Sequence, residues 1–292
     1  MANIRISFFS TQYVSNVARV IKLNWWLCFN ALAVDTVLIA IFWQSLVAEV
    51  FDIELEHSYR ILLGAAVWLG YVADRVLDGF QITDRVCSAR HSIAFRYREI
   101  LFFVWIGVLL LAVFFAFNTL SLSELCKCFL LAFLCLLNSI INVIDKFEKF
   151  PIAKELRTAL LFASGVYIFI ALEVTTFTTW SWITFLSFAS LCFANCCYVA
   201  SWDRAVDMNQ GQSSLSLRGN LSLALLRFLS LLMAFTCILL SFFLSKNLNL
   251  FFIAIGSAVL ALPLIDIWIN GSENKRLLAD LGLLLSASCV LL

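Results

Sequence analysis

Residues 100–119 read ILFFVWIGVLLLAVFFAFNT, a run that contains no charged side chain. At a rise of about 1.5 Å per residue, a helix of this length crosses the hydrocarbon core of a bilayer, which is about 30 Å thick. The whole chain shares this character, because 63% of its 292 residues are hydrophobic and only 13% are charged. The sequence therefore predicts an all-α, polytopic membrane protein.

Apolar stretches of similar length recur along the chain and predict about nine transmembrane helices. We expect them at 24–50, 58–80, 100–119, 123–145, 152–174, 180–203, 219–245, 248–269 and 275–292. The last stretch is short and contains Asp280, so a bundle of eight helices is the alternative. Linkers rich in glycine or proline are absent, which predicts one transmembrane domain over 1–292, with an N-terminal cytoplasmic segment at 1–23 and a cytoplasmic loop or cap at 81–99.

The distribution of basic residues predicts the orientation of the chain. With nine crossings, seventeen of the 20 Lys and Arg residues fall on the side that holds the N-terminus. Only Arg60, Lys127 and Lys246 fall on the other side. Because cytoplasmic loops accumulate positive charge, we place the first side in the cytoplasm. A net charge of +1 gives no indication of a nucleic-acid partner.

Two acidic pairs stand at the cytoplasmic ends of apolar segments. They are Asp74 and Asp78 in YVADRVLDG (71–79), and Asp203 and Asp207 in YVASWDRAVD (198–207). Residues four apart lie on one face of a helix, so both carboxylates of a pair can point into one cavity. Mg²⁺ prefers oxygen ligands and commonly joins one or two carboxylates to substrate phosphates. The pairs predict one divided site for a magnesium-bound diphosphate, and the alternative is that each pair forms helix-end ion pairs with Arg75 and Arg204.

The motifs resemble those of the UbiA superfamily of intramembrane prenyltransferases. The first family motif, NDxxDxxxD, corresponds to 70–78, where Asp74 and Asp78 are present but Gly70 and Tyr71 replace the opening Asn-Asp. The second motif corresponds to DRAVDMNQG (203–211). The stretch FPIAKELRTALLFASG (150–165) resembles the segment that enters the fifth helix of the family, with Lys154 where a basic residue helps to hold diphosphate. The resemblance is to a divergent, bacterial branch, and it implies a protein of the bacterial inner membrane.

This resemblance implies nine helices around a central cavity that opens on the cytoplasmic side, and a function as a Mg²⁺-dependent transferase. Such an enzyme ionises a prenyl diphosphate and transfers the prenyl group to a lipophilic acceptor, while metal and positioned cations stabilise the leaving pyrophosphate. Because the first motif is altered, two alternatives stay open. One is a terpene cyclase of UbiA type, which needs no acceptor, and the other is a non-catalytic protein that binds or transports lipids.

Further residues are expected at this site. The metal ligands and catalytic residues would be Asp74, Asp78, Asp203 and Asp207, and the diphosphate contacts would be Lys154, Arg75 and Arg204. The cavity would be lined by Trp68, Tyr71, Asn195 and Asp35. For the first three, ordinary helix packing or an interhelical hydrogen bond is the alternative. Asp35, expected in the middle of the first helix, would serve either as an acceptor-side base or in a structural hydrogen bond.

Overall fold

The structure is a computed structural model that describes residues 29–30, 32–81, 89–144, 152–174, 176–204, 208, 215 and 222–291. Within these ranges the long elements are all helices and no strand occurs. In chain order, the helices are α3 (Val34–Val50), α4 (His57–Gln81), α5 (Ala89–Thr119), α6 (Leu122–Ile144), α7 (Lys154–Glu173), α8 (Thr179–Trp202), α10 (Leu223–Ser241), α11 (Lys246–Trp268) and α12 (Ser272–Leu291). The all-helical prediction is confirmed over the described part of the chain.

Six of these helices are long and apolar enough to cross a membrane: α5, α6, α7, α8, α10 and α11. This supports an integral membrane protein. The other three are less apolar or shorter: α3 has only 17 residues, and α12 carries Lys275, Arg276 and Asp280. Nine crossings, the membrane in question and the orientation therefore stay predictions.

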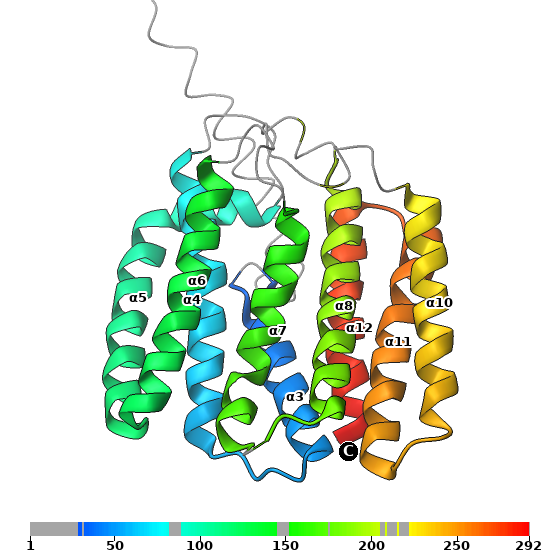
Figure 1. Ribbon diagram of the computed structural model, residues 1–292. Helices are drawn as coiled ribbons and strands as arrows, with labels where there is room; N and C mark the ends of the chain where they lie inside the picture. Colours follow the sequence, from blue (N-terminus) through cyan, green and yellow to red (C-terminus); the bar gives the residue numbers. More distant parts are fainter. Residues whose placement is uncertain are drawn as a thin grey trace, which may run out of the picture.

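Successive helices run in alternating directions through the bundle (Figure 1). The turns from α3 to α4, α5 to α6, α7 to α8 and α10 to α11 lie at the lower end in this view. The C-terminal ends of α4 and α8 and the N-terminal ends of α7 and α12 therefore lie at the upper end. Both sequence motifs consequently begin at the same end of the bundle.

Two helix starts differ from the sequence expectation. The first described helix was expected from residue 24, but α3 begins at Val34, after a turn in which Ala33 has a positive φ of 55°. Asp35 therefore lies in the first turn of α3, where a carboxylate interacts favourably with the helix dipole, and not in the middle of a helix. In the same way, α5 begins at Ala89, inside the range 81–99 expected to be a loop. The segment 1–23 lies outside the described residues.

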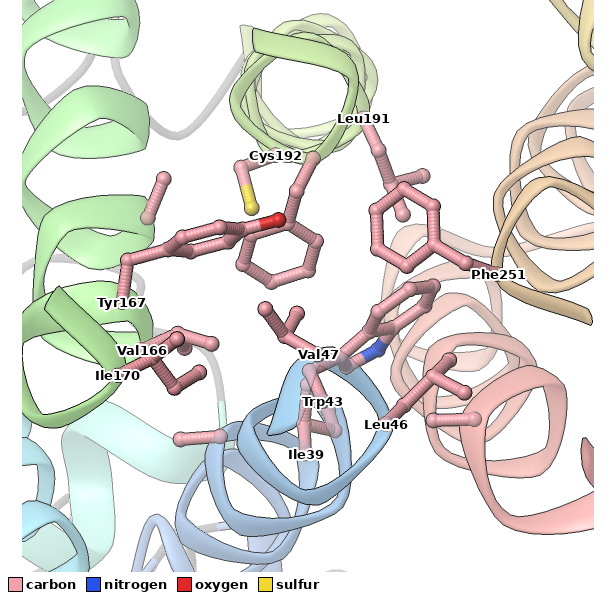
Figure 2. Packing of buried hydrophobic residues seen from close by; sticks show 14 of the residues in the cluster. Ile39, Trp43, Leu46, Val47, Val166, Tyr167, Ile170, Leu191, Cys192 and Phe251 are labelled. Atoms are coloured by element: carbon pink, nitrogen blue, oxygen red, sulfur yellow. The ribbon is translucent and has the colours of Figure 1, made fainter. Parts of the chain in front are cut away.

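The centre of the bundle is built around Trp43 of α3, which is fully buried. Its indole Nε1 donates a hydrogen bond to the carbonyl oxygen of Leu283 in α12 at 3.1 Å. Its ring lies 4.9 Å from that of Phe188 in α8 and meets Phe251 of α11 edge-on at 6.3 Å. Figure 2 shows Tyr167 of α7 directed toward the same cluster. Trp43 thus connects α3 with α8, α11 and α12. Such contacts stabilise the bundle because close packing, rather than exclusion of water, drives helix association in lipid.

The outer edge of the bundle is formed by α5 and α6, at the left in Figure 1. Their apolar side chains are largely exposed, with Phe103 at 72% and Phe114 at 70%. Soluble monomers rarely expose so wide an apolar surface, whereas a lipid-facing helix requires one. The exposed faces of α5 and α6 therefore support the membrane assignment.

Candidate functional site

One face of α8 points its polar side chains toward the other helices. Asn195 and Cys196 follow Cys192 by three and four residues, and Asp203 follows Cys196 by seven, so all four lie on the same side of the helix. Asp203 is the residue that ends α8, and it is only 5% exposed. This face carries the second acidic motif into the interior of the bundle.

Asp203 forms a buried ion pair with the last helix. Nη1 of Arg276 in α12 donates a hydrogen bond to Oδ2 of Asp203 at 2.6 Å, and both side chains are more than nine-tenths buried. Arg204, the neighbour that the alternative interpretation paired with Asp203, is exposed. The ion pair therefore exists, but its cation comes from a helix distant in sequence.

Tyr71 of α4 lies between three helices. It interacts electrostatically with Cys192 and Cys196 of α8, with Asp280 of α12 and with Arg75 of its own helix. Its side chain nevertheless keeps 37% of its surface exposed. Tyr71 stands where the first family motif has Asp, so an aromatic side chain takes the place of that carboxylate near the inner face of α8.

The first turn of α7 reaches the same place. Cys196 interacts electrostatically with Lys154 and Glu155 of α7, and also with Asp280 of α12. Lys154 is half-buried, whereas Glu155 is only 5% exposed. Side chains from α4, α7, α8 and α12 therefore converge around Cys196.

A hydrogen-bond network at the start of α3 closes this group of helices. Nδ2 of Asn30 donates to Oδ2 of Asp35 at 2.6 Å and to Oδ2 of Asp280 at 3.1 Å. The carbonyl oxygen of Asn30 accepts a hydrogen bond from Nη1 of Arg75 at 2.5 Å. The other oxygen of Asp35 accepts from the backbone N–H of Thr36 at 2.9 Å. Both oxygens of Asp35 are therefore engaged, which supports its structural role over that of a base.

The remaining predicted residues are less closely involved. Trp68 and Asn195 are half-buried, and Oδ1 of Asn195 has no hydrogen-bond partner in the described ranges. Asp74 is exposed on α4. Asp78 belongs to α4, but its side chain lies outside what the structure describes, and Asp207 lies outside the described residues altogether. Over the part of the chain that is described, no group of three or more His, Cys, Asp or Glu side chains is placed to hold a metal ion.

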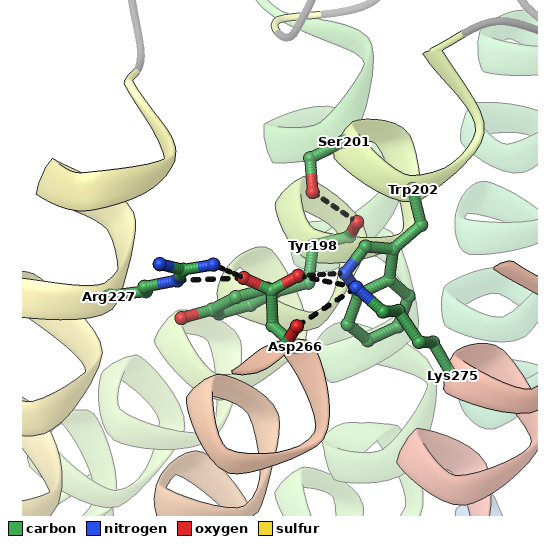
Figure 3. Close-up of polar contacts among 6 residues, drawn as sticks. All are labelled: Tyr198, Ser201, Trp202, Arg227, Asp266 and Lys275. Atoms are coloured by element: carbon green, nitrogen blue, oxygen red, sulfur yellow. Dashed lines mark hydrogen bonds and ion pairs between the residues drawn. The ribbon is translucent and has the colours of Figure 1, made fainter. Parts of the chain in front are cut away.

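Sequence analysis missed another buried carboxylate, Asp266 of α11. Figure 3 shows it surrounded by side chains from α8, α10 and α12. Oδ2 of Asp266 accepts hydrogen bonds from Nε and Nη2 of Arg227 in α10 at 2.8 and 2.6 Å. Its Oδ1 accepts from Nε1 of Trp202 in α8 at 2.8 Å and from Nζ of Lys275 in α12 at 3.0 Å. The available signal was that Asp266 is the one acidic residue within the apolar stretch 248–269, where a carboxylate requires a partner.

This network determines how α12 lies against α8. Trp202 directly precedes Asp203, and Lys275 directly precedes Arg276. Asp266 binds the first residue of each pair, while the second residues bind each other. The two sets of contacts support the same register, so Asp266 positions Arg276 opposite Asp203.

Comparison with known proteins identifies no relative, because no family model, curated protein or solved structure matches this chain. The resemblance to UbiA prenyltransferases, carried by its motifs, therefore stays a prediction.

Proposed function

We propose that this protein is an integral membrane prenyltransferase that binds a prenyl diphosphate at the end of the bundle where α4, α7, α8 and α12 converge. The observation that supports it best is the arrangement around Cys196. Acidic, basic and aromatic side chains that are distant in sequence approach one another there, at one end of apolar helices. Charge is costly within a membrane unless it is paired or used, so such a concentration favours a site for an ionic group.

The cations of the site would bind the diphosphate. Lys154 lies on the first turn of α7 and interacts electrostatically with Cys196. Arg75 lies near the end of α4 and interacts electrostatically with Tyr71. Arg276 of α12 places a further positive charge beside Asp203, at the end of α8. A guanidinium binds phosphate oxygens with two parallel hydrogen bonds, and it stays charged in a buried setting. These groups would stabilise the negative charge that develops on the leaving pyrophosphate.

The carboxylates suit a divalent cation chemically, since Mg²⁺ selects hard oxygen ligands and needs only one or two of them beside phosphate. Asp74, Asp78, Asp203 and Asp207 would hold it. When bound, Mg²⁺ would supply positive charge to the pyrophosphate. Arg276 already neutralises one oxygen of Asp203, so part of the positive charge at this motif is supplied by the chain itself.

The apolar part of the substrate would extend between the helices, below the charged groups. Tyr71 and Trp68 lie three residues apart on α4, so their rings are on neighbouring positions of one helix face. An aromatic face stabilises a nearby cation by about 2 kcal/mol or more in a desolvated site. The two rings would therefore shelter the allylic cation from water after ionisation.

The test combines binding with product analysis. Purified protein is heated with and without prenyl diphosphates of several lengths and Mg²⁺, because a ligand that binds only the folded state raises the melting temperature. Products are then identified by mass spectrometry after incubation with a cellular lipid extract. A prenylated lipid supports the proposal, a hydrocarbon or terpene alcohol made without acceptor supports the cyclase, and no stabilisation supports the non-catalytic alternative.

Variants make this test specific. Asp203→Asn and Lys154→Met are expected to abolish pyrophosphate release. The matched control is Glu54→Gln, because Glu54 is an exposed carboxylate before α4, at the opposite end of the bundle. Unchanged release in both site variants would refute the assignment.

A further inference from the structure

Glu155 presents an unusual combination of burial and bonding. It lies in the first turn of α7, and only 5% of its surface is exposed. Oε1 accepts a hydrogen bond from the backbone N–H of Leu215 at 2.9 Å. Oε2 is buried and has no hydrogen-bond partner among the residues that the structure describes. Leaving a buried polar atom without a partner is unfavourable, and more so for a charged group, so Oε2 requires an explanation.

The surroundings of Glu155 place it beside the proposed substrate site. It interacts electrostatically with Cys196 and with Cys197 of α8. Cys196 also interacts with Tyr71 of α4 and Asp280 of α12. Glu155 therefore lies beside residues that would surround the allylic end of a prenyl diphosphate if its phosphates were bound by Lys154, Arg75 and Arg276.

We propose that Oε2 of Glu155 binds the hydroxyl group of the lipophilic acceptor and removes its proton during transfer. This inference rests on the proposed function. The bond between C1 of the prenyl group and the diphosphate oxygen breaks, and its electron pair leaves with pyrophosphate. A lone pair of the acceptor oxygen forms the new bond to C1. The hydroxyl proton passes to Oε2 of Glu155, and it is returned to water after the prenyl ether has left.

The other interior carboxylates are engaged differently. Both oxygens of Asp35 accept hydrogen bonds. Asp203 is paired with the guanidinium of Arg276, and Asp280 accepts a hydrogen bond from Asn30. Glu155 and Asp203 each have one buried oxygen without a hydrogen bond among the described residues, but Asp203 is already neutralised by a guanidinium, which makes it the weaker base. Glu155 therefore best fits the role of a base that binds a hydroxyl group.

The substitution Glu155→Gln separates this role from a structural one. The amide has the same shape, and its carbonyl oxygen retains the hydrogen bond from Leu215. Its NH₂ group then occupies the position of Oε2 and cannot accept a proton. We expect prenyl diphosphate to stabilise this variant as it stabilises the wild type, while formation of the prenyl ether falls about 100-fold, the lower range of a general base's contribution. Glu155→Asp, which retains a carboxylate, is expected to recover activity at least tenfold over the Gln variant.

The acceptor probes are 4-nonylphenol and hexadecanol, each offered with prenyl diphosphate, and the ether is measured by mass spectrometry. Ether from one probe identifies the class of hydroxyl. Ether formation by Glu155→Gln within about threefold of the wild-type rate would overturn the proposal. Loss of prenyl diphosphate binding in that variant would also overturn it, because it would indicate a structural role for Glu155. An inactive wild type that binds no prenyl diphosphate would instead refute the proposed function itself.

Discussion

The buried pair between Asp203 and Arg276 makes a sharp prediction about stability. Replacing Arg276 by Met removes the cation but leaves a carboxylate that is only 5% exposed. Removal of one partner from a buried ion pair typically costs about 3–5 kcal/mol, because the remaining charge stays desolvated. We expect Arg276→Met to lower the unfolding free energy by about 3 kcal/mol, and Asp203→Asn to lower it by a similar amount.

The double variant provides the decisive measurement. When both charges are gone, no uncompensated charge is left, so Asp203→Asn with Arg276→Met should cost less than the sum of the single changes by about 2 kcal/mol. Unfolding can be followed by tryptophan fluorescence as detergent micelles are titrated with dodecyl sulfate. The control is Arg227→Met, which should cost only about 1.5 kcal/mol, because Asp266 keeps its hydrogen bonds from Trp202 and Lys275. Additive single effects, within about 0.5 kcal/mol, would show that the pair contributes no coupling and would refute the reasoning.

Three further predictions use the same unfolding assay. A Cβ at Gly256 of α11 would lie 2.8 Å from Cγ1 of Ile238 in α10, so Gly256→Ala should lower the unfolding free energy by about 1–3 kcal/mol. The control is Gly107→Ala, which should not destabilise the protein, because no atom lies within 4 Å of the added Cβ. Tyr59→Phe removes a hydroxyl that lies 3.1 Å from Oε1 of Glu124 in α6 and 3.1 Å from Oε1 of Glu173 in α7. This substitution should lower the unfolding free energy by about 1.5 kcal/mol, and no change would mean that water replaces the hydroxyl group. Asp266→Asn should cost about 3 kcal/mol and should weaken the coupling of the buried pair on α8 and α12; an unchanged coupling would refute its positioning role.

The helices were predictable because their signal is local. A run of about twenty apolar residues bounded by charged or polar ones defines a span, and the expected ranges 58–80 and 180–203 match α4 and α8 closely. The start of α3 was not predictable in this way. Asn30 and Asp35 looked like polar residues within one long helix, but Asn30 bonds Asp280, which is 250 positions away in the chain. A contact so distant leaves no local pattern in the sequence.

The location of the two motif-bearing helix ends at one end of the bundle was also predictable. Alternating helices bring the ends of α4 and α8 to the same side of the bundle, as their even spacing in the sequence implies. The partner of Asp203 was not predictable, because Arg204 is adjacent in the chain but points elsewhere on the helix, about 100° away. The actual partner, Arg276, is 73 positions distant. Neighbours in sequence are poor candidates for ion pairs on a helix, whereas positions three or four apart are good ones.

The properties that made α12 an uncertain membrane helix are those that connect it to the rest of the site. Its charges Lys275, Arg276 and Asp280 lower its apolar character, and each bonds a different helix or segment. Lys275 bonds Asp266 of α11, Arg276 bonds Asp203 of α8, and Asp280 bonds Asn30 before α3. Because a buried charge persists only where it is compensated, these three contacts within six residues join α12 to the surrounding helices at the end of the bundle that holds both sequence motifs. A weakly hydrophobic helix with such contacts is therefore better interpreted as a wall of the proposed site than as a peripheral segment.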